Sequence, residues 1–163
     1  MTKKIIAFDL DDTLCRAKSP IDSTMAPLLK ELLDYYDVCI ITGGLLKQIQ
    51  SQVLDNLELT TDELKKLHLM PTCGTQYYLY DEQSGDWAQQ YAENLTDEQV
   101  ERITTVLRES AIALDLWEPN PAGEIIENRG SQVTMSTLGQ QANAEDKYAW
   151  DPTGEKKIAI RNH

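Results

Sequence analysis

The sequence predicts an α/β protein in which part of a parallel sheet is followed by a second α/β domain. Residues 4–8 and 38–41 form two short apolar runs without polar alternation, which is typical of strands covered on both faces. Residues 23–36, between these runs, carry leucines at helical spacing. A strand, a helix and a strand in that order form the parallel crossover unit, so residues 1–82 are expected to form the core domain.

Local signals predict the remaining elements of this core domain. Ser23 or Thr24 is available as the N-cap of the first helix. Further helices are expected at residues 45–54 and 60–66, and a third strand at residues 67–71. Aromatic alternation around a Ser-Gly-Asp turn predicts a hairpin over residues 73–91. The composition changes along this hairpin, and we therefore place the domain boundary near residues 80–84.

Residues 83–163 are expected to form the second α/β domain. Thr96 and Gln99 give a capping-box pattern at the start of an amphipathic helix. Residues 123–137 have the pattern of two strands joined by a turn at Arg129 and Gly130. Residues 144–163 are expected to end in a helix.

The charge balance limits the classes of partner. The 163 residues are 41% hydrophobic, which is enough to build a core. A formal net charge of −12 and a pI near 4.5 argue against broad binding to nucleic acid or to an anionic membrane, because both require a positive surface. Partners are therefore expected among small molecules, cations and proteins.

The cysteines and the N-terminal residues predict a cytoplasmic protein. The three cysteines, Cys15, Cys39 and Cys73, have no CxxC spacing, and Cys39 lies in an apolar run where a small buried hydrophobe is expected. Asp9 interrupts the first apolar run too early for a signal peptide, and no later run is long enough to span a membrane.

Three carboxylates follow the first predicted strand. Asp9, Asp11 and Asp12 repel one another at neutral pH, at the strand end where parallel sheets bind ligands. Asp9 and Asp11 point roughly the same way if the chain stays extended, and together they could ligate Mg²⁺, which would offset the repulsion. The alternative is a strand end capped by turn-forming Asp residues, with Thr13 satisfying a local backbone group.

A metal-neutralised phosphoryl group would give these carboxylates distinct roles. Asp9 could attack phosphorus as a nucleophile and form an aspartyl phosphate. Asp11 could protonate the leaving oxygen and afterwards activate water or another hydroxyl group.

The stretch "FDLDDTL" resembles the first motif of the haloacid dehalogenase superfamily, in which an apolar strand runs into Asp-x-Asp-x-Thr. Asp9, Asp11 and Thr13 match this motif in order. Thr42, after the second predicted strand, matches the second motif, so that its hydroxyl and the Gly43 amide are expected to hold a phosphate oxygen. The alternative for Thr42 is a helix N-cap.

Residues 123–140 narrow the resemblance to the subgroup that contains eukaryotic-type phosphomannomutases and sugar-phosphate phosphatases. The resemblance implies a partial Rossmann-like core with a parallel sheet and an inserted α/β cap. Arg129 matches a substrate-phosphate ligand of that family, and Lys18 lies where those enzymes tend to have an arginine. Gln140 and Ala122 replace two further arginines. Fewer cap cations favour hydrolysis over mutase activity.

The superfamily pattern also includes a lysine and a second acidic pair after the cap, and neither is recognisable here. The chain is therefore expected to lack the C-terminal part of the core and of the cap. It would be either a fragment of a longer enzyme or a chain completed by another, which allows for a homo-oligomer.

The leading hypothesis is a Mg²⁺-dependent sugar-phosphate phosphatase. Asp9 and Asp11 would be the catalytic residues and metal ligands, and Lys18, Thr42, Gly43, Arg129 and Gln140 would bind substrate or phosphate. One alternative is a phosphomannomutase that interconverts mannose 1- and 6-phosphates. The other is a non-catalytic remnant that binds a phosphorylated ligand.

Overall fold

The computed structural model describes residues 4–163, which form two compact units. The first unit ends at Glu93 and the second is Asn94–His163. The sequence placed the boundary at residues 82/83, within the predicted hairpin. The structure places it later because the second hairpin strand, β5 (Asp86–Ala92), pairs with β4 (Gln76–Asp81) and so belongs to the first unit.

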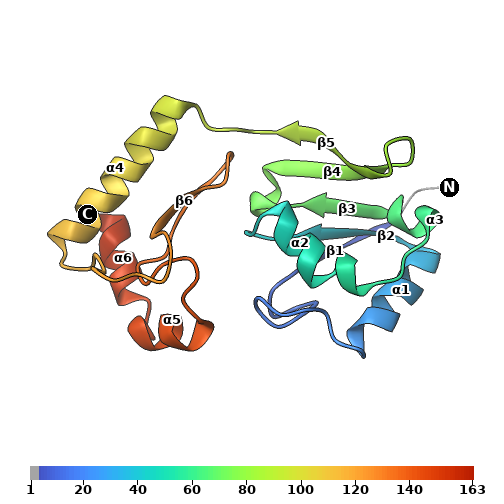
Figure 1. The fold of residues 1–163 in the computed structure, drawn as a ribbon, viewed down its shortest axis with the longest axis horizontal. Helices are drawn as coiled ribbons and strands as arrows, with labels where there is room; N and C mark the ends of the chain where they lie inside the picture. Colours follow the sequence, from blue (N-terminus) through green and yellow to red (C-terminus); the bar gives the residue numbers. More distant parts are fainter. Residues whose placement is uncertain (1–3) are drawn as a thin grey trace. The chain divides into compact units, whose positions relative to one another are not determined.

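The first unit contains a five-stranded sheet in the order β1-β2-β3-β4-β5 (Figure 1). The first three strands, β1 (Ile5–Asp9), β2 (Asp37–Ile41) and β3 (Leu67–Met70), pair in parallel. β4 runs antiparallel to β3, and β5 runs antiparallel to β4. The sheet is therefore mixed, and the expectation of a parallel sheet holds only for its first three strands.

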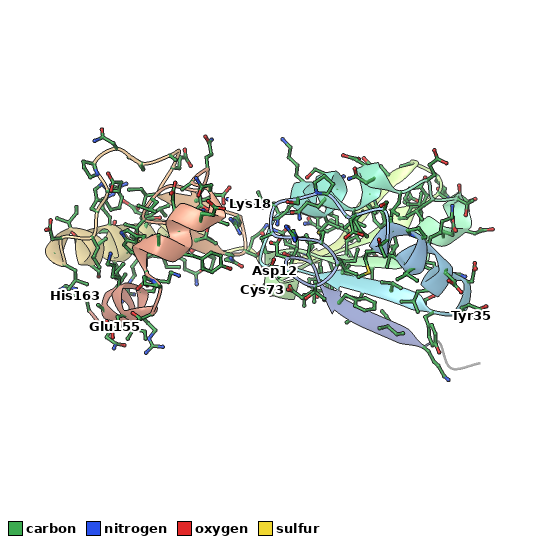
Figure 2. The ribbon with its side chains drawn as sticks, turned by 90° about the horizontal axis from the view of Figure 1, so that it is seen from below. Asp12, Lys18, Tyr35, Cys73, Glu155 and His163 are labelled. Atoms are coloured by element: carbon green, nitrogen blue, oxygen red, sulfur yellow. The ribbon has the colours of Figure 1, made fainter. Side chains whose placement is uncertain are left out.

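The helices of the first unit lie on one side of the sheet (Figure 2). They are α1 (Met25–Tyr35), α2 (Leu46–Gln52) and α3 (Thr61–Leu64), and a single 3₁₀ turn, η1 (Leu54–Asn56), follows α2. The short turn η2 (Thr72–Gly74) follows β3 and has a left-handed backbone. Leu33 of α1 and Ile49 of α2 are fully buried against Ile40 and Leu69 of the sheet. Burying each such side chain contributes roughly 1.5–3 kcal/mol, so this face is the core of the unit.

β1 is less covered than its apolar sequence suggests. Residues 38–40 of β2 are buried, as expected for a strand covered on both faces. In β1, Ile5, Ala7 and Asp9 are exposed and alternate with half-buried residues. The prediction was therefore wrong for β1, because the exposed residues alternate along the strand and so share the face of the sheet that the helices do not cover.

The start of α1 is capped by a residue that the sequence analysis did not select. Neither Ser23 nor Thr24 makes a side-chain capping bond to the helix; instead, Asp22 Oδ1 accepts hydrogen bonds from the backbone N–H groups of Thr24 and Met25, both at 2.8 Å. These two bonds, with the Met25 bond the stronger influence, lower the pKa of Asp22. Asp22 therefore replaces the expected cap.

The second unit contains α4 (Asp97–Ala113), the hairpin of β6 (Ile126–Asn128) and β7 (Val133–Met135), α5 (Ala144–Trp150) and α6 (Glu155–Asn162). The predicted capping box is confirmed, since Thr96 accepts from Gln99 N and Gln99 from Thr96 N. The predicted strand pair is also confirmed: the strands are antiparallel, and Arg129 and Gly130 lie in their turn. The C-terminal segment forms two helices, because Asp151 interrupts them and accepts from Lys156 N and Lys157 N.

The buried sheet face predicts which isoleucine stabilises the first unit. Ile40→Ala should lower the free energy of unfolding by about 2–5 kcal/mol, because it leaves a cavity between α1, α2 and the sheet. Ile5→Ala, at a side chain that is 53% exposed, should change it by less than about 0.5 kcal/mol. Urea unfolding of both variants tests this; equal losses would contradict the assignment of the core.

The Asp22 cap predicts a pH dependence of stability. Because its folded pKa is lowered, Asp22 stabilises the fold above its ordinary unfolded pKa of about 4, and this contribution is lost as the pH falls through the folded pKa. Asp22→Ala should therefore reduce stability at pH 7 and flatten its decline below about pH 4. Thermal unfolding from pH 2 to 7 measures this. Asp34→Ala, at an exposed position on α1, is the control and should leave the acid decline unchanged.

Candidate active site

The carboxyl ends of the three parallel strands lie side by side at one end of the sheet. Asp9 pairs in register with Ile41, and Ile41 with Met70, so the loops that follow β1, β2 and β3 start side by side. Figure 2 shows Asp12, Lys18 and Cys73 at this end of the first unit, and Tyr35 at the opposite end. This is the edge at which the sequence analysis expected Asp9 and Thr42 to meet.

Asp9 is exposed, whereas the loop after it is tightly ordered. Leu10 is fully buried, and its carbonyl accepts hydrogen bonds from Leu14 N and Cys15 N. Asp12 has a left-handed backbone (φ 59°), and its carboxylate accepts from Ala17 N at 3.2 Å. For Asp12, the interpretation as a turn-forming residue therefore agrees with the structure.

The Asp11 carboxylate is held by three hydrogen-bond donors. Its Oδ1 accepts from Lys18 N and from Gln52 Nε2, both at 3.2 Å, and its Oδ2 accepts from Gln48 Nε2 at 2.8 Å. Sequence reasoning missed both glutamines. The available signal was their spacing of four residues, which puts two amides on one face of the helix that follows Thr42.

Thr42 organises the loop after β2. It is buried; its N–H donates to Met70 O, and its Oγ1 accepts from Gly44 N at 3.1 Å. The alternative of a helix N-cap is wrong for Thr42, since the N-cap position of α2 is Leu45. Gly43 follows Thr42 directly, and its Cα lies close to the thiol of Cys73, because a Cβ at position 43 would be 3.6 Å from Cys73 Sγ.

The loop after β3 contributes a feature that the sequence did not suggest. Thr72, Cys73 and Gly74 all have positive φ values, of 51°, 58° and 82°. A left-handed conformation is unfavourable for a β-branched residue such as Thr72, which is fully buried. Backbone bonds from Thr72 N to Gly44 O and from Cys73 N to Thr42 O hold this loop against the loop after β2.

The predicted site residues divide between the two units. Asp9, Asp11, Lys18, Thr42 and Gly43 lie in the first unit, where Lys18 is exposed and has a left-handed backbone. Arg129 and Gln140 lie in the second. Arg129 Nε donates to Glu127 Oε2 at 2.7 Å, and Gln140 Nε2 lies 3.3 Å from Thr134 Oγ1. Both side chains therefore contact the hairpin of β6 and β7.

The carboxylates present suit part of a Mg²⁺ site. Within residues 4–163, no three His, Cys, Asp or Glu side chains are grouped closely enough to hold a metal ion. Mg²⁺ is commonly bound by one or two carboxylates, with waters and substrate phosphate in the other positions. Asp9 and Asp11 supply two such groups, and the Asp11 carboxylate has about four acceptor positions, of which three are used.

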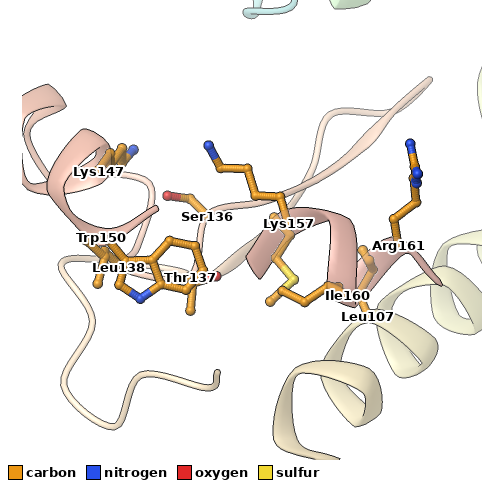
Figure 3. A pocket seen from close by; sticks show the side chains of 10 residues that line it. Leu107, Ser136, Thr137, Leu138, Lys147, Trp150, Lys157, Ile160 and Arg161 are labelled. Atoms are coloured by element: carbon orange, nitrogen blue, oxygen red, sulfur yellow. The ribbon is translucent and has the colours of Figure 1, made fainter. Parts of the chain in front are cut away.

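The second unit has a cavity of about 570 Å³ (Figure 3). Apolar side chains, including Leu107, Trp150 and Ile160, line it together with the basic residues Lys157 and Arg161. None of the residues selected from the sequence lines this cavity, and no acidic residue does.

No helix within residues 4–163 has both the length and the apolar character needed to cross a membrane.

Comparisons with known proteins agree with the fold. No family model matches the sequence. A phosphomannomutase from Schizosaccharomyces pombe is 25% identical over 149 residues, which cover 91% of this chain and 56% of the relative. Among solved structures, the IMP-nucleotidase of Plasmodium falciparum matches 98% of this chain and 46% of its own, with a TM-score of 0.60 and 12% identity. Its ATP-bound form matches with a TM-score of 0.59, at 13% identity, over 98% of this chain and 41% of its own.

The chain therefore has the haloacid dehalogenase-like hydrolase fold and is a distant homologue of phosphomannomutase, as the sequence motifs predicted. It spans about half the length of the relatives it matches.

The geometry predicts which cysteine is accessible at the site. Cys73 is exposed, whereas Cys15 and Cys39 are buried, and burial raises the pKa of both of these thiols. Brief treatment of the native protein with N-ethylmaleimide at pH 7.5 should modify Cys73 alone. Peptide mass spectrometry identifies the site, and Cys73→Ser should abolish native-state labelling. Labelling of Cys15 or Cys39 at a comparable rate would contradict their burial.

Proposed function

We propose that this chain carries the nucleophile half of a Mg²⁺-dependent phosphatase that acts on hexose phosphates. The observation that supports this most is the contrast between two neighbouring carboxylates at the sheet edge. Asp9 is exposed, as a nucleophile must be, whereas the Asp11 carboxylate is fixed by three donors. A turn that merely ended β1 would require neither arrangement.

The proposed reaction proceeds in two displacements. An Asp9 carboxylate oxygen attacks phosphorus, the ester P–O bond breaks, and the sugar oxygen leaves with a proton from Asp11. A water molecule then gives a proton to Asp11 and attacks the same phosphorus, which releases phosphate and restores Asp9. The acceptor position of the Asp11 carboxylate that is not used by its three donors can carry the proton.

Thr42 and Gly43 would hold the transferring group. The Thr42 hydroxyl accepts from Gly44 N, which orients the hydroxyl and lets it donate its own hydrogen to a phosphate oxygen. Mg²⁺, when bound by Asp9, would neutralise phosphate charge and permit the approach of the carboxylate. The one acceptor position of Asp11 that its three donors leave unused then remains for the proton. Lys18 would contribute to substrate recognition in the first unit, and Arg129 and Gln140 are the candidate substrate ligands of the second unit.

The superfamily pattern calls for a lysine and for further acidic ligands. We propose that these come from additional polypeptide, since the chain spans about half of its phosphomannomutase relative. A second copy of the chain is the other source, and light scattering would reveal such an oligomer. The free cysteines are consistent with a cytoplasmic location.

Two alternatives make different predictions. A phosphomannomutase would interconvert mannose 1- and 6-phosphates and be stimulated by a hexose 1,6-bisphosphate. A non-catalytic remnant would be stabilised thermally by hexose phosphates without releasing phosphate. The replacement of two expected arginines by Ala122 and Gln140 favours hydrolysis over the mutase reaction.

The Asp9 side chain provides the decisive test. Phosphate release from a panel of hexose phosphates should require Mg²⁺ and should fall by about a thousandfold or more in Asp9→Asn, because the nucleophile is lost. Asp12→Asn is the matched control: it keeps an acceptor for Ala17 N and should retain activity. Circular dichroism would confirm that both variants fold. Retained activity in Asp9→Asn would remove Asp9 from this role, and thermal stabilisation without turnover would support the binding remnant.

A further inference from the structure

The side chains of Gln48 and Gln52 meet the Asp11 carboxylate from one face of α2. Gln48 Nε2 donates to Oδ2 at 2.8 Å, and Gln52 Nε2 donates to Oδ1 at 3.2 Å. Because the two glutamines are four residues apart, they lie one helical turn apart, and each amide contacts a different carboxylate oxygen. Two donors to two oxygens fix both the position of the carboxylate and the rotation of its plane.

Gly44 allows Gln48 to adopt this position. A Cβ added at Gly44 would lie 1.9 Å from Gln48 Oε1 and 2.7 Å from Gln48 Cδ, so the side-chain amide of Gln48 occupies the space beside the glycine. The Gly44 N–H donates to Thr42 Oγ1, and the Gly44 carbonyl accepts from Thr72 N. The loop that carries Thr42 is therefore packed directly against the amide that holds Asp11.

Gln52 is almost fully buried, and its amide nitrogen is surrounded by acceptors. The residue is 4% exposed, and Nε2 lies within 3.2 Å of Asp11 Oδ1, Cys15 Sγ and Ser19 O. Exchanging the amide oxygen and nitrogen would place an acceptor against the Asp11 carboxylate and the Ser19 carbonyl, so this orientation is the one that the neighbours require.

We propose that Gln48 and Gln52 are positioning residues that hold the Asp11 side chain in one orientation for proton transfer. The role in proton transfer rests on the proposed function, whereas the fixed orientation does not. The fixed orientation rests on the contacts themselves: the Gln48 and Gln52 amides donate to different oxygens of Asp11, and Gln52 Nε2 is also within 3.0 Å of Ser19 O. Gly44, in turn, is required for Gln48 to reach Asp11.

The orientation of Asp11 can be measured directly in the 163-residue chain. Three-bond Hα–Hβ couplings report whether Asp11 occupies one χ1 rotamer or averages over several. We expect one rotamer in the unmodified protein and averaged couplings in Gln48→Leu and in Gly44→Ala. Gly44→Ala is the more selective variant, because only the flexible end of Gln48 must move and Gly44 does not have a positive φ.

Gln50→Leu is the matched control. Gln50 lies on α2 between the two glutamines, and the contacts described for Asp11 do not include it. This variant should keep a single Asp11 rotamer. A fixed Asp11 in both Gln48→Leu and Gly44→Ala would overturn the proposal, as would averaging of Asp11 in Gln50→Leu to the same degree. Gln52→Leu, checked for folding by circular dichroism, should also release Asp11.

Kinetics separate this proposal from the proposed function. In protein that releases phosphate, Gly44→Ala and Gln48→Leu should lower kcat by about ten- to a hundredfold with little change in KM, as expected when a catalytic group is misplaced. Unchanged kcat with an averaged Asp11 would overturn the positioning role and leave the Asp9 chemistry intact. In protein without turnover, the couplings alone decide whether the glutamines fix Asp11.

Discussion

The parallel register of β1, β2 and β3 is the constraint on which the candidate site depends. It brings the residues after Asp9, Ile41 and Met70 to one edge, and backbone bonds then tie the second and third loops together: Thr42 N to Met70 O, Cys73 N to Thr42 O, and Thr72 N to Gly44 O. The first loop joins them through α2, whose Gln48 and Gln52 hold Asp11. Three segments distant in sequence thus become one surface because their strands are adjacent.

The charge of the acidic cluster is offset largely by neutral groups. The sequence suggests a cation as the counterweight to three nearby carboxylates. In the structure, backbone or amide N–H groups stabilise two of them: Asp11 accepts from Lys18 N, Gln48 and Gln52, and Asp12 accepts from Ala17 N. These donors are neutral, so they hold the two side chains without adding a positive charge. Asp9 remains exposed to solvent, so its carboxylate is accessible to a bound metal ion or to a phosphate group.

The sequence predicts elements well where one local pattern determines them. The apolar run of β2, the spacing of α1 and the Thr96 capping box depend on neighbouring residues, and all three are confirmed. The hairpin of β4 and β5 was predicted from its turn as well. The mixed sheet depends on the antiparallel pairing of β4 with β3, a contact between separate segments that local composition does not specify. Similarly, Asp9, Asp11 and Thr42 could be found from motifs, whereas Gln48 and Gln52 gain their importance only from contacts with a residue about forty positions earlier.

The distribution of unfavourable features argues for function at this edge. A plain turn after β1 would need only the loop bonds of Leu10 and Asp12, which cost little. The structure instead places a left-handed, buried Thr72 and a left-handed Cys73 in the loop after β3. A conformation of this kind is unfavourable by roughly 1–3 kcal/mol on its own. Both residues donate backbone bonds to the loop after β2, Thr72 N to Gly44 O and Cys73 N to Thr42 O. The unfavourable conformations therefore lie where the loops around Asp9 and Asp11 are aligned, which is where a functional site is proposed.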